Sequence, residues 1–407
     1  MTFRLVLFLG LLIPLVSHAG ERIEQATYQQ SALPEEVVHA KSERAYHMVR
    51  TRGANAASVA LLLQLCRDLP DKNSAKLFER LAREWHTAGE IDLAGECRRT
   101  LLQKFPSSPE AKAAFLDLIQ TYSSGEVAHA HRLTSAMKTS AEQGPANRQM
   151  LTYAGMFSTQ QLKANKALQT PDLDWHRGTI QRLLGKEKAA IGLHTPLKRR
   201  PPGDSYRKRV DFEEWVTGDR ESEAPIPTIA CVYSAQRPHL DGVLDDPIWN
   251  GKVNESPTAK PQAVALRFAY DSEYLYFTAK VERKASIAFV PDERPRSRDT
   301  DLSNFDRVRF LLDVDRDYAT AYEMTIDHRG WTSDACWGDA TWNPEWFVAA
   351  HSSETHWQVE VAVAWSSLVD SPPTASDAWA VRCERLLPEQ VVPAKPQAAD
   401  YSVLLFE

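Results

Sequence analysis

Hydrophobic and polar positions alternate along much of the C-terminal half of the chain. Between residues 304 and 326, the apolar positions Val308, Phe310 and Leu312 recur at every second residue, and the pattern returns from Tyr322 to Ile326. A period of two places alternate side chains on opposite faces of a β-strand. The acidic, turn-rich residues 313–317 separate the two runs, so we predict an antiparallel β-hairpin.

Further runs of the same kind surround this hairpin. Residues 263–270 and 273–281 predict a strand pair, and the alternating valines of residues 356–364 predict another strand. A polar turn at residues 239–249 precedes them. Short strands separated by turn signals are typical of an antiparallel β-sandwich, which we expect over residues 226–407.

The hydrophobic period differs in the N-terminal half. Apolar residues recur at helical spacing in residues 35–49, 56–66, 75–85 and 91–105, and Gly89 and Pro106 lie between runs. We predict an array of α-helical hairpins over residues 34–195. The fold class is therefore a multidomain chain, helical first and all-β afterwards.

The two regular patterns are separated by residues 196–225, where no period is visible. This segment is first basic and then acidic and contains Pro201 and Pro202, so we predict a linker. A basic patch for acidic glycans is the alternative interpretation of the same residues.

Four collinear motifs in the C-terminal half carry a family resemblance. They are LDG-x-LDD-x-x-W at 240–249, D-x-E-x-LYF at 271–277, D-x-V-x-F-x-LD at 306–313 and W-x-V-E-V-A-V-x-W-x-x-L at 357–368. Together they resemble the family 9 carbohydrate-binding modules and their DOMON-like relatives. The resemblance implies a β-sandwich that binds carbohydrate, in a family that often carries structural calcium.

A second resemblance concerns the helical half. Residues 76–106 resemble one tetratricopeptide repeat, with Trp85 and Gly89 at the aromatic and turn positions. The following unit matches less well, so we predict a degenerate TPR-like array. Such arrays contact proteins, which implies a protein partner.

Composition and the N-terminus bear on location. The 407 residues have a net charge of -6, which gives no reason to expect nucleic acid as a partner. Residues 1–19 combine Arg4, an apolar run and Ser17-His18-Ala19, so we predict a cleaved signal peptide and export to the periplasm or the extracellular space, with no later membrane span. Of the five cysteines, Cys66 and Cys97 form the best candidate pair for a disulfide; buried free thiols are the alternative.

Tryptophans are the first candidates for a sugar site, because aromatic faces stack on pyranose rings. Trp249, Trp357 and Trp365 match framework positions of the family, so we expect them in the core. The segment after Gly330 carries the remaining candidates, which we predict to be carbohydrate-binding: Trp331, Trp337, Trp342 and Trp346.

Hydrogen-bonding partners for the sugar are expected from Arg309 and Asp306. The family has a tryptophan where this chain has Ser303 and a glutamate where it has Arg309, which shifts the expected site toward the tryptophan-rich segment. If the hairpin is symmetric about Arg316, Arg309 lies directly across from Glu323. The two form either an ion pair or the floor of a binding face.

The acidic turn of the hairpin is the best candidate for a metal. Asp313, Asp315 and Asp317 offer alternating oxygens that suit calcium, although Tyr318 stands where an EF-hand loop needs glycine. A solvated turn is the alternative.

These observations predict an exported, non-catalytic binding protein whose sandwich binds a glycan and whose helices contact protein. The alternatives are a scaffolding protein whose sandwich has lost sugar binding, and an accessory part of a polysaccharide-degrading system. No nucleophile elbow, zinc-protease motif or phosphate loop is present. Glu345 could form a glycosidase-like acidic pair with either Glu360 or Asp339.

Overall fold

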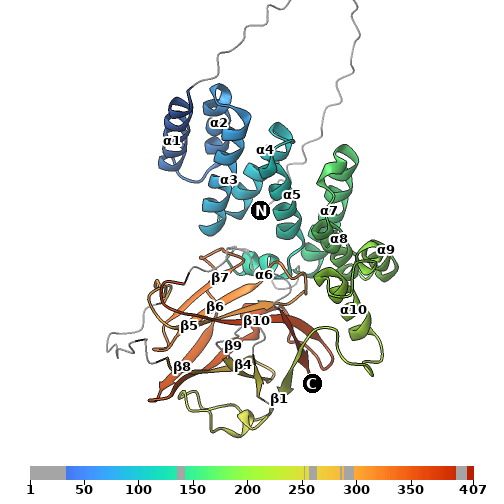
Figure 1. Cartoon of the computed structure of the whole chain (residues 1–407), viewed down its shortest axis with the longest axis vertical. Helices are drawn as coiled ribbons and strands as arrows, with labels where there is room; N and C mark the ends of the chain where they lie inside the picture. The colour runs from blue at the N-terminus through green and yellow to red at the C-terminus, as the bar shows by residue number, and fades with distance from the viewer. Residues whose placement is uncertain are drawn as a thin grey trace, which may run out of the picture.

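The computed structural model describes residues 34–134, 143–251, 253–255, 264–284, 287, 298–390 and 401–407. The predicted signal peptide, residues 1–19, lies outside them. In the described part, helices occupy the N-terminal half and a curled, mixed β-sheet the C-terminal half, as the sequence predicts (Figure 1). The helices are α1 (Glu35–Thr51), α2 (Ala56–Leu65), α3 (Asp71–Thr87), α4 (Ile91–Lys104), α5 (Pro109–Ser123), α6 (Gly125–Thr134), α7 (Gln143–Ala164), α8 (Pro171–Leu183), α9 (Glu187–Lys198), α10 (Ser205–Thr217) and the short α11 (Trp365–Leu368).

Local sequence signals start and stop these helices. The Ser108 hydroxyl accepts a hydrogen bond from Ala111 N at 3.0 Å at the start of α5, and Thr170 caps α8 in the same way. Gly89 turns the chain between α3 and α4 with φ +78, a conformation that suits glycine. A side chain at position 89 would also collide with Thr341 of the β-domain. The helices therefore approach the sheet closely.

The strands form one continuous ladder that folds over on itself. They are β1 (Thr228–Tyr233), β2 (Asn254–Glu255), β3 (Val264–Tyr270), β4 (Tyr274–Glu282), β5 (Arg307–Asp313), β6 (Tyr322–Asp327), β7 (Thr332–Cys336), β8 (Trp346–Ser352), β9 (His356–Ala364), β10 (Ala378–Leu386) and β11 (Ser402–Phe406). Their order is β7-β6-β5-β10-β11-β1-β3-β4-β9-β8, and β2 pairs with β3. β1 runs parallel to both β11 and β3, and the other pairs are antiparallel.

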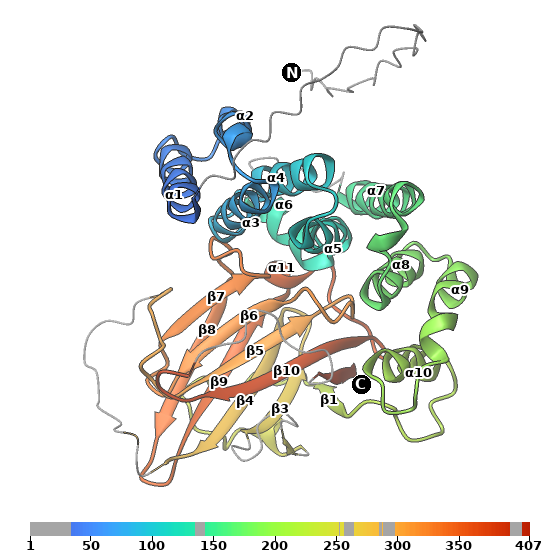
Figure 2. The ribbon, with the colours of Figure 1, turned by 45° about the horizontal axis from the view of Figure 1, so that its top comes forward.

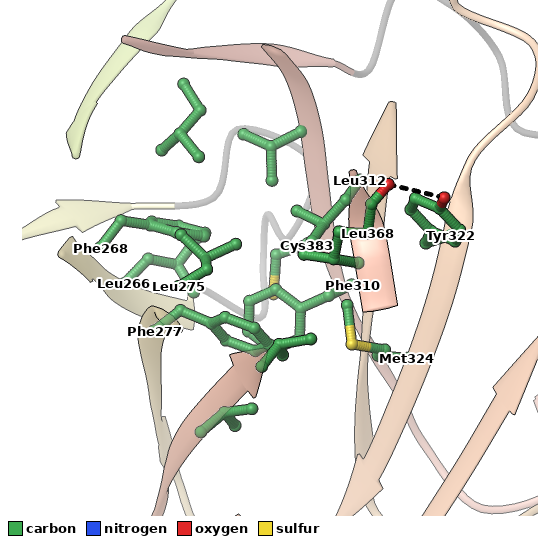
Figure 3. Packing of buried hydrophobic residues seen from close by; sticks show 14 of the residues in the cluster. Leu266, Phe268, Leu275, Phe277, Phe310, Leu312, Tyr322, Met324, Leu368 and Cys383 are labelled. Atoms are coloured by element: carbon green, nitrogen blue, oxygen red, sulfur yellow. Dashed lines mark hydrogen bonds between the residues drawn. The ribbon is translucent and has the colours of Figure 1, made fainter. Parts of the chain in front are cut away.

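The two halves of the ladder pack face to face and enclose the main core. Phe310 of β5 meets Phe277 of β4 with ring centroids 4.4 Å apart, and Figure 3 shows both rings among the apolar side chains between the layers. Tyr322 places its hydroxyl at the edge of this core, where it donates to the Leu368 carbonyl at 2.8 Å. The alternating positions that predict the strands thus become the two inner faces of the sandwich.

The framework tryptophans are buried, as predicted. Trp249, Trp357 and Trp365 are 2%, 0% and 3% exposed. Trp249 donates to Glu360 Oε1 at 2.7 Å, while Glu360 Oε2 accepts the amides of Asp241 and Gly242. Glu360 therefore pins the 239–249 turn onto β9 and is a structural residue.

The helices form an arch along one side of the β-sandwich (Figure 2). Val127 and Ala130 of α6 belong to the sandwich core itself. Trp175 of α8 and Phe212 of α10 share a second apolar cluster with residues of β5, β10 and β11, including Leu311. The two parts therefore share two hydrophobic clusters.

The prediction that residues 196–225 form a linker is wrong. Within residues 196–225 the chain forms α10, because Asp204 caps its first amides and because Val210 and Phe212 bury their side chains against the sheet. Tertiary burial, which a periodicity analysis of the segment alone does not detect, provides the stability.

The cysteines also resolve one alternative. All five are buried free thiols, so the proposed Cys66–Cys97 pair is wrong. No helix in the described part of the chain has the length and apolar character needed to cross a membrane.

Candidate functional site

A cleft of about 350 Å³ lies between the helical arch and the outer face of the sheet. Its helical wall comes from α3, α4 and α5, and its sheet wall from β5, β6 and the turn after β7. The residues that line it are Glu79, Arg83, His86, Thr87, Arg98, Ala113, Asp117, Leu311, Ala319, Ala321, Glu323, Trp337 and Gly338. The cleft is thus built by both parts of the molecule.

The helical wall carries three buried charged side chains. Glu79, Arg98 and Asp117 are 8%, 3% and 6% exposed. Arg98 Nη2 lies 3.5 Å from Asp117 Oδ2, and Glu79 Oε1 accepts from Arg83 Nε at 3.0 Å. Burial, and next the neighbouring Asp117, raise the pKa of Glu79 above its usual value.

His86 joins the helical wall to the sheet wall. Its Nε2 lies 2.8 Å from the Trp337 carbonyl, and its Nδ1 lies 3.4 Å from Arg98 Nη1. Because a carbonyl only accepts and a guanidinium only donates, the neutral Nε2–H tautomer satisfies both neighbours. Burial first, and then the Arg98 charge, lower the pKa of His86.

Trp337 is the aromatic surface of the cleft. It is half-buried, its ring meets His86 edge-on at 4.7 Å, and its backbone has φ +48. Positive φ is unfavourable for a bulky residue and persists where surrounding contacts hold it. The contact with His86 is one such restraint.

The sheet wall continues into a charged ladder across β6, β5 and β10. Arg309 Nε donates to Glu384 Oε1 at 2.6 Å, and Arg309 Nη1 lies 3.3 Å from Glu323 Oε2. The predicted ion pair therefore forms, but the predicted register is wrong: Arg309 pairs with Thr325, and Glu323 lies opposite Leu311. The pair is diagonal on one face. Burial raises the pKa of Glu323, which borders the cleft.

The structure brings only part of the predicted sugar site to this cleft. Trp337 lines it, and Arg309 reaches it through Glu323. Asp306 is fully buried, where its carboxylate accepts from Trp357 Nε1 at 2.9 Å and from Arg385 at 2.8 and 2.6 Å. Its oxygens have no free access to a ligand.

The other three predicted tryptophans lie elsewhere. Trp342 is 2% exposed and stacks on Tyr322 at 4.6 Å inside the core. Trp331 is 5% exposed, beneath the Arg329 guanidinium. Trp346 begins β8, where its indole donates to Asp334.

The prediction for these tryptophans is wrong because it treated the segment after Gly330 as a loop. The stretch after Gly330 is not one long loop, because residues 332–336 form β7 and residues 346–352 form β8. Trp331 and Trp337 therefore flank opposite ends of β7.

A second group of side chains gathers where α6 meets the β5–β6 hairpin. Glu126, Asp313 and Asp315 are all buried, and each offers a carboxylate oxygen within 4.8 Å of the other two. Oxygen donors of this kind suit calcium, so the residues fit the predicted metal, with Glu126 in place of Asp317. The same carboxylates accept backbone amides: Glu126 from Val314 at 2.5 Å, and Asp315 from Gly125 at 2.7 Å.

Electrostatics in this acidic group are repulsive. Burial, followed by the neighbouring carboxylates, raises the pKa values of Glu126 and Asp313 well above their usual range, and burial raises that of Asp315 to about 7. Asp317 is also buried, and its Oδ1 accepts the amides of both Ala319 and Thr320. Near neutral pH the group holds protons or needs a cation.

Of the acids considered for a glycosidase, Glu345 is exposed, but neither of its possible partners is. Glu360 is fully buried and its oxygens are occupied by the 239–249 turn. Asp339 caps the backbone of Thr341 at 2.8 Å.

No protein-family model matches the sequence, and no curated protein matches it. Among solved structures, a family 9 carbohydrate-binding module from Caldicellulosiruptor kristjanssonii in complex with cellotriose is similar, with 14% identity, a TM-score of 0.31, and coverage of 44% of this chain and 93% of that one. A carbohydrate-binding protein described as putative, from Bacteroides uniformis, matches with 12% identity and a TM-score of 0.32, over 45% of this chain and 100% of that one.

Sequence reasoning missed the whole helical wall of the cleft. Glu79 and His86 are seven residues apart, which places them on one face of α3, beside the apolar stripe that contains Phe78 and Trp85. Polar residues that border a buried stripe are a weak signal, because most are solvated. The partner surface on the sheet could not be deduced from the helix alone.

Proposed function

We propose that this protein is an exported, non-catalytic binding protein that takes up a carbohydrate in the cleft between the helical arch and the sheet. The observation that carries the proposal is the cleft itself, in which the Trp337 ring stands beside buried, oriented charged groups. Sugar sites combine an aromatic face with fixed hydrogen-bonding groups.

The size of the cleft limits the ligand. A volume of 350 Å³ lies at the lower end of the roughly 300–1,000 Å³ typical of small-molecule sites. The site therefore suits one or two sugar units, such as the end of a glycan, better than an extended chain. The sequence resemblance to family 9 modules is consistent with a carbohydrate.

We propose export from the signal-like residues 1–19. The proposed binding role is non-catalytic, and Glu360, considered above as a catalytic acid, instead holds the 239–249 turn. The helical array remains available for a protein partner on its outer surface, where Tyr153 and Met156 are 44% and 67% exposed. A scaffolding role is the second candidate, favoured by the two hydrophobic clusters that the helices and the sheet share.

The test is glycan binding by the full mature chain and by Trp337→Ala. Loss of the aromatic surface should weaken binding roughly tenfold, since aromatic contacts contribute on the order of 1 kcal/mol beyond area. Phe347→Ala is the matched control, because Phe347 is exposed on β8 and is not among the residues that line the cleft. A wild-type protein that binds no glycan on a broad array contradicts the proposal and leaves the scaffolding role.

Trp249→Ala separates folding from binding. Trp249 is buried away from the cleft, so its removal should cost about 3–5 kcal/mol of unfolding free energy. Chemical denaturation measures this loss. The tryptophan of the site and the tryptophan of the core should thus differ in which property they change.

A further inference from the structure

The helical wall of the cleft holds two buried polar atoms without a hydrogen-bond partner among the described residues. They are Glu79 Oε2 and Arg98 Nε. Both residues line the cleft and are more than nine-tenths buried. Buried polar atoms in native proteins nearly always have a hydrogen-bond partner. The acceptor Glu79 Oε2 and the donor Arg98 Nε can therefore take their partners from a ligand.

The remaining atoms of both side chains are fixed. Glu79 Oε1 is held by Arg83, and the terminal nitrogens of Arg98 are held by His86 and Asp117. Each group is thereby oriented before any ligand arrives. Such preorganisation reduces the entropy that binding must overcome.

An acceptor and a donor at one wall match a pair of neighbouring hydroxyl groups. One hydroxyl donates to the carboxylate oxygen, and the next accepts from the guanidinium N–H. A sugar ring offers such pairs, and its apolar face can meet an aromatic ring on the opposite wall.

We propose, on the basis of the function proposed above, that Glu79 and Arg98 of the helical arch recognise two adjacent hydroxyls of the sugar while Trp337 contacts it from the sheet. The binding site is then assembled by both parts of the chain, and the helices determine which sugars are accepted. This differs from the sequence prediction, which placed every contact in the sandwich.

A ligand held in this way bridges the two parts. The protein contacts beside it are the His86–Trp337 hydrogen bond and the Ala340 amide, which donates to the Thr87 carbonyl at 3.1 Å. A sugar between α3, α4 and the sheet adds contacts across the same junction. Binding should therefore reduce the opening of α3 and α4 as well as of the sheet.

Titration calorimetry on the full mature chain tests the proposal, with short neutral gluco-, manno-, xylo- and galacto-oligosaccharides as probes. We expect Glu79→Gln and Arg98→Lys each to weaken binding about tenfold or more, because hydrogen bonds to charged groups are among the stronger ones. Glu43→Gln is the matched control: Glu43 also pairs with an arginine, Arg80 at 2.7 Å, but is not among the residues that line the cleft.

The outcomes separate this proposal from the one on which it rests. Unchanged affinity in both variants, with loss in Trp337→Ala, overturns the role of the helices and leaves sugar binding intact. No binding by the wild type overturns both. If either variant does not fold, amide hydrogen exchange of the wild type decides: protection of α3 and α4 by the sugar supports the proposal, and protection confined to the sheet overturns it.

Discussion

Two buried glutamates reach from the helical arch to the same hairpin of the sandwich, and their surroundings are opposite. Glu126 of α6 lies among Asp313, Asp315 and Asp317, whereas Glu213 of α10 lies between Arg316 and Arg182. Arg316 donates to both carboxylate oxygens of Glu213, at 2.9 and 3.0 Å.

The pKa values of the two glutamates differ accordingly. Burial alone would raise the pKa of both Glu126 and Glu213. For Glu126 the neighbouring carboxylates raise the pKa further, while for Glu213 the charges of Arg182 and Arg316 outweigh burial and lower the pKa to about 2. Burial therefore does not decide whether a carboxylate stabilises a domain contact; the sign of the charge it meets does.

The largest expected effect is at the paired glutamate. Glu213→Gln leaves the buried Arg316 and Arg182 without a counter-charge, which should cost about 3–5 kcal/mol of unfolding free energy. Urea unfolding measures the loss.

Glu214→Gln provides the control on the same helix. Glu214 pairs with Lys198, and both side chains are nearly half exposed, so the change should stay within about 0.5 kcal/mol. Equal losses in the two variants would contradict the importance of burial and pairing at Glu213.

The next largest effect is at the acidic group, where substitution should increase the free energy of unfolding in a way that depends on pH. Glu126, Asp313 and Asp315 have raised pKa values when folded, so the native state keeps protons that the unfolded chain has released above about pH 4. Their contribution to stability is present at acid pH and is lost as the pH rises through about 7, the value for Asp315.

Glu126→Gln should remove part of this loss. We expect the variant to gain stability relative to the wild type, by on the order of 1 kcal/mol near pH 8, with little difference near pH 5. The penalty of Glu213→Gln should be the same at both pH values, because a group with a pKa of about 2 is ionised at either. A Glu126→Gln difference that does not change with pH would show that the carboxylates do not share protons.

The comparison also indicates what the sequence could and could not predict. The β5–β6 hairpin and the buried Trp249 follow from alternation and motif, because both are local patterns. The contact between Glu126 and Val314 joins residues 188 positions apart, and no local period encodes it. For the same reason α10 was predicted as linker: its apolar residues gain a partner only when the sheet is present.

The candidate site was also predictable only in part. Trp337 could be selected by residue type, but its separation from Trp331 depends on β7, and Trp342 turned inward to stack on Tyr322. Glu79 and Arg98 can be recognised as cleft residues only when the position of the sheet opposite them is known. Residue chemistry was predictable, whereas the juxtaposition of distant elements was not.

The smallest expected effect concerns calcium at the acidic group. If a calcium ion is held there, Glu126, Asp313 and Asp315 supply the oxygens, because their carboxylate oxygens lie within 4.8 Å of one another and Asp317 is not part of that group. Calcium should then raise the melting temperature near pH 8, where the carboxylates are ionised, and a chelator should reverse the shift. Near pH 5 protons occupy the same groups, and calcium should have little effect. Glu126→Gln should abolish the calcium-dependent shift, and Asp317→Asn should retain it, whatever each does to the baseline stability. A shift that survives Glu126→Gln would place the ion away from the contact between α6 and the hairpin, and identical melting with calcium and with chelator at both pH values would leave the group as a set of carboxylates held by protons and backbone amides.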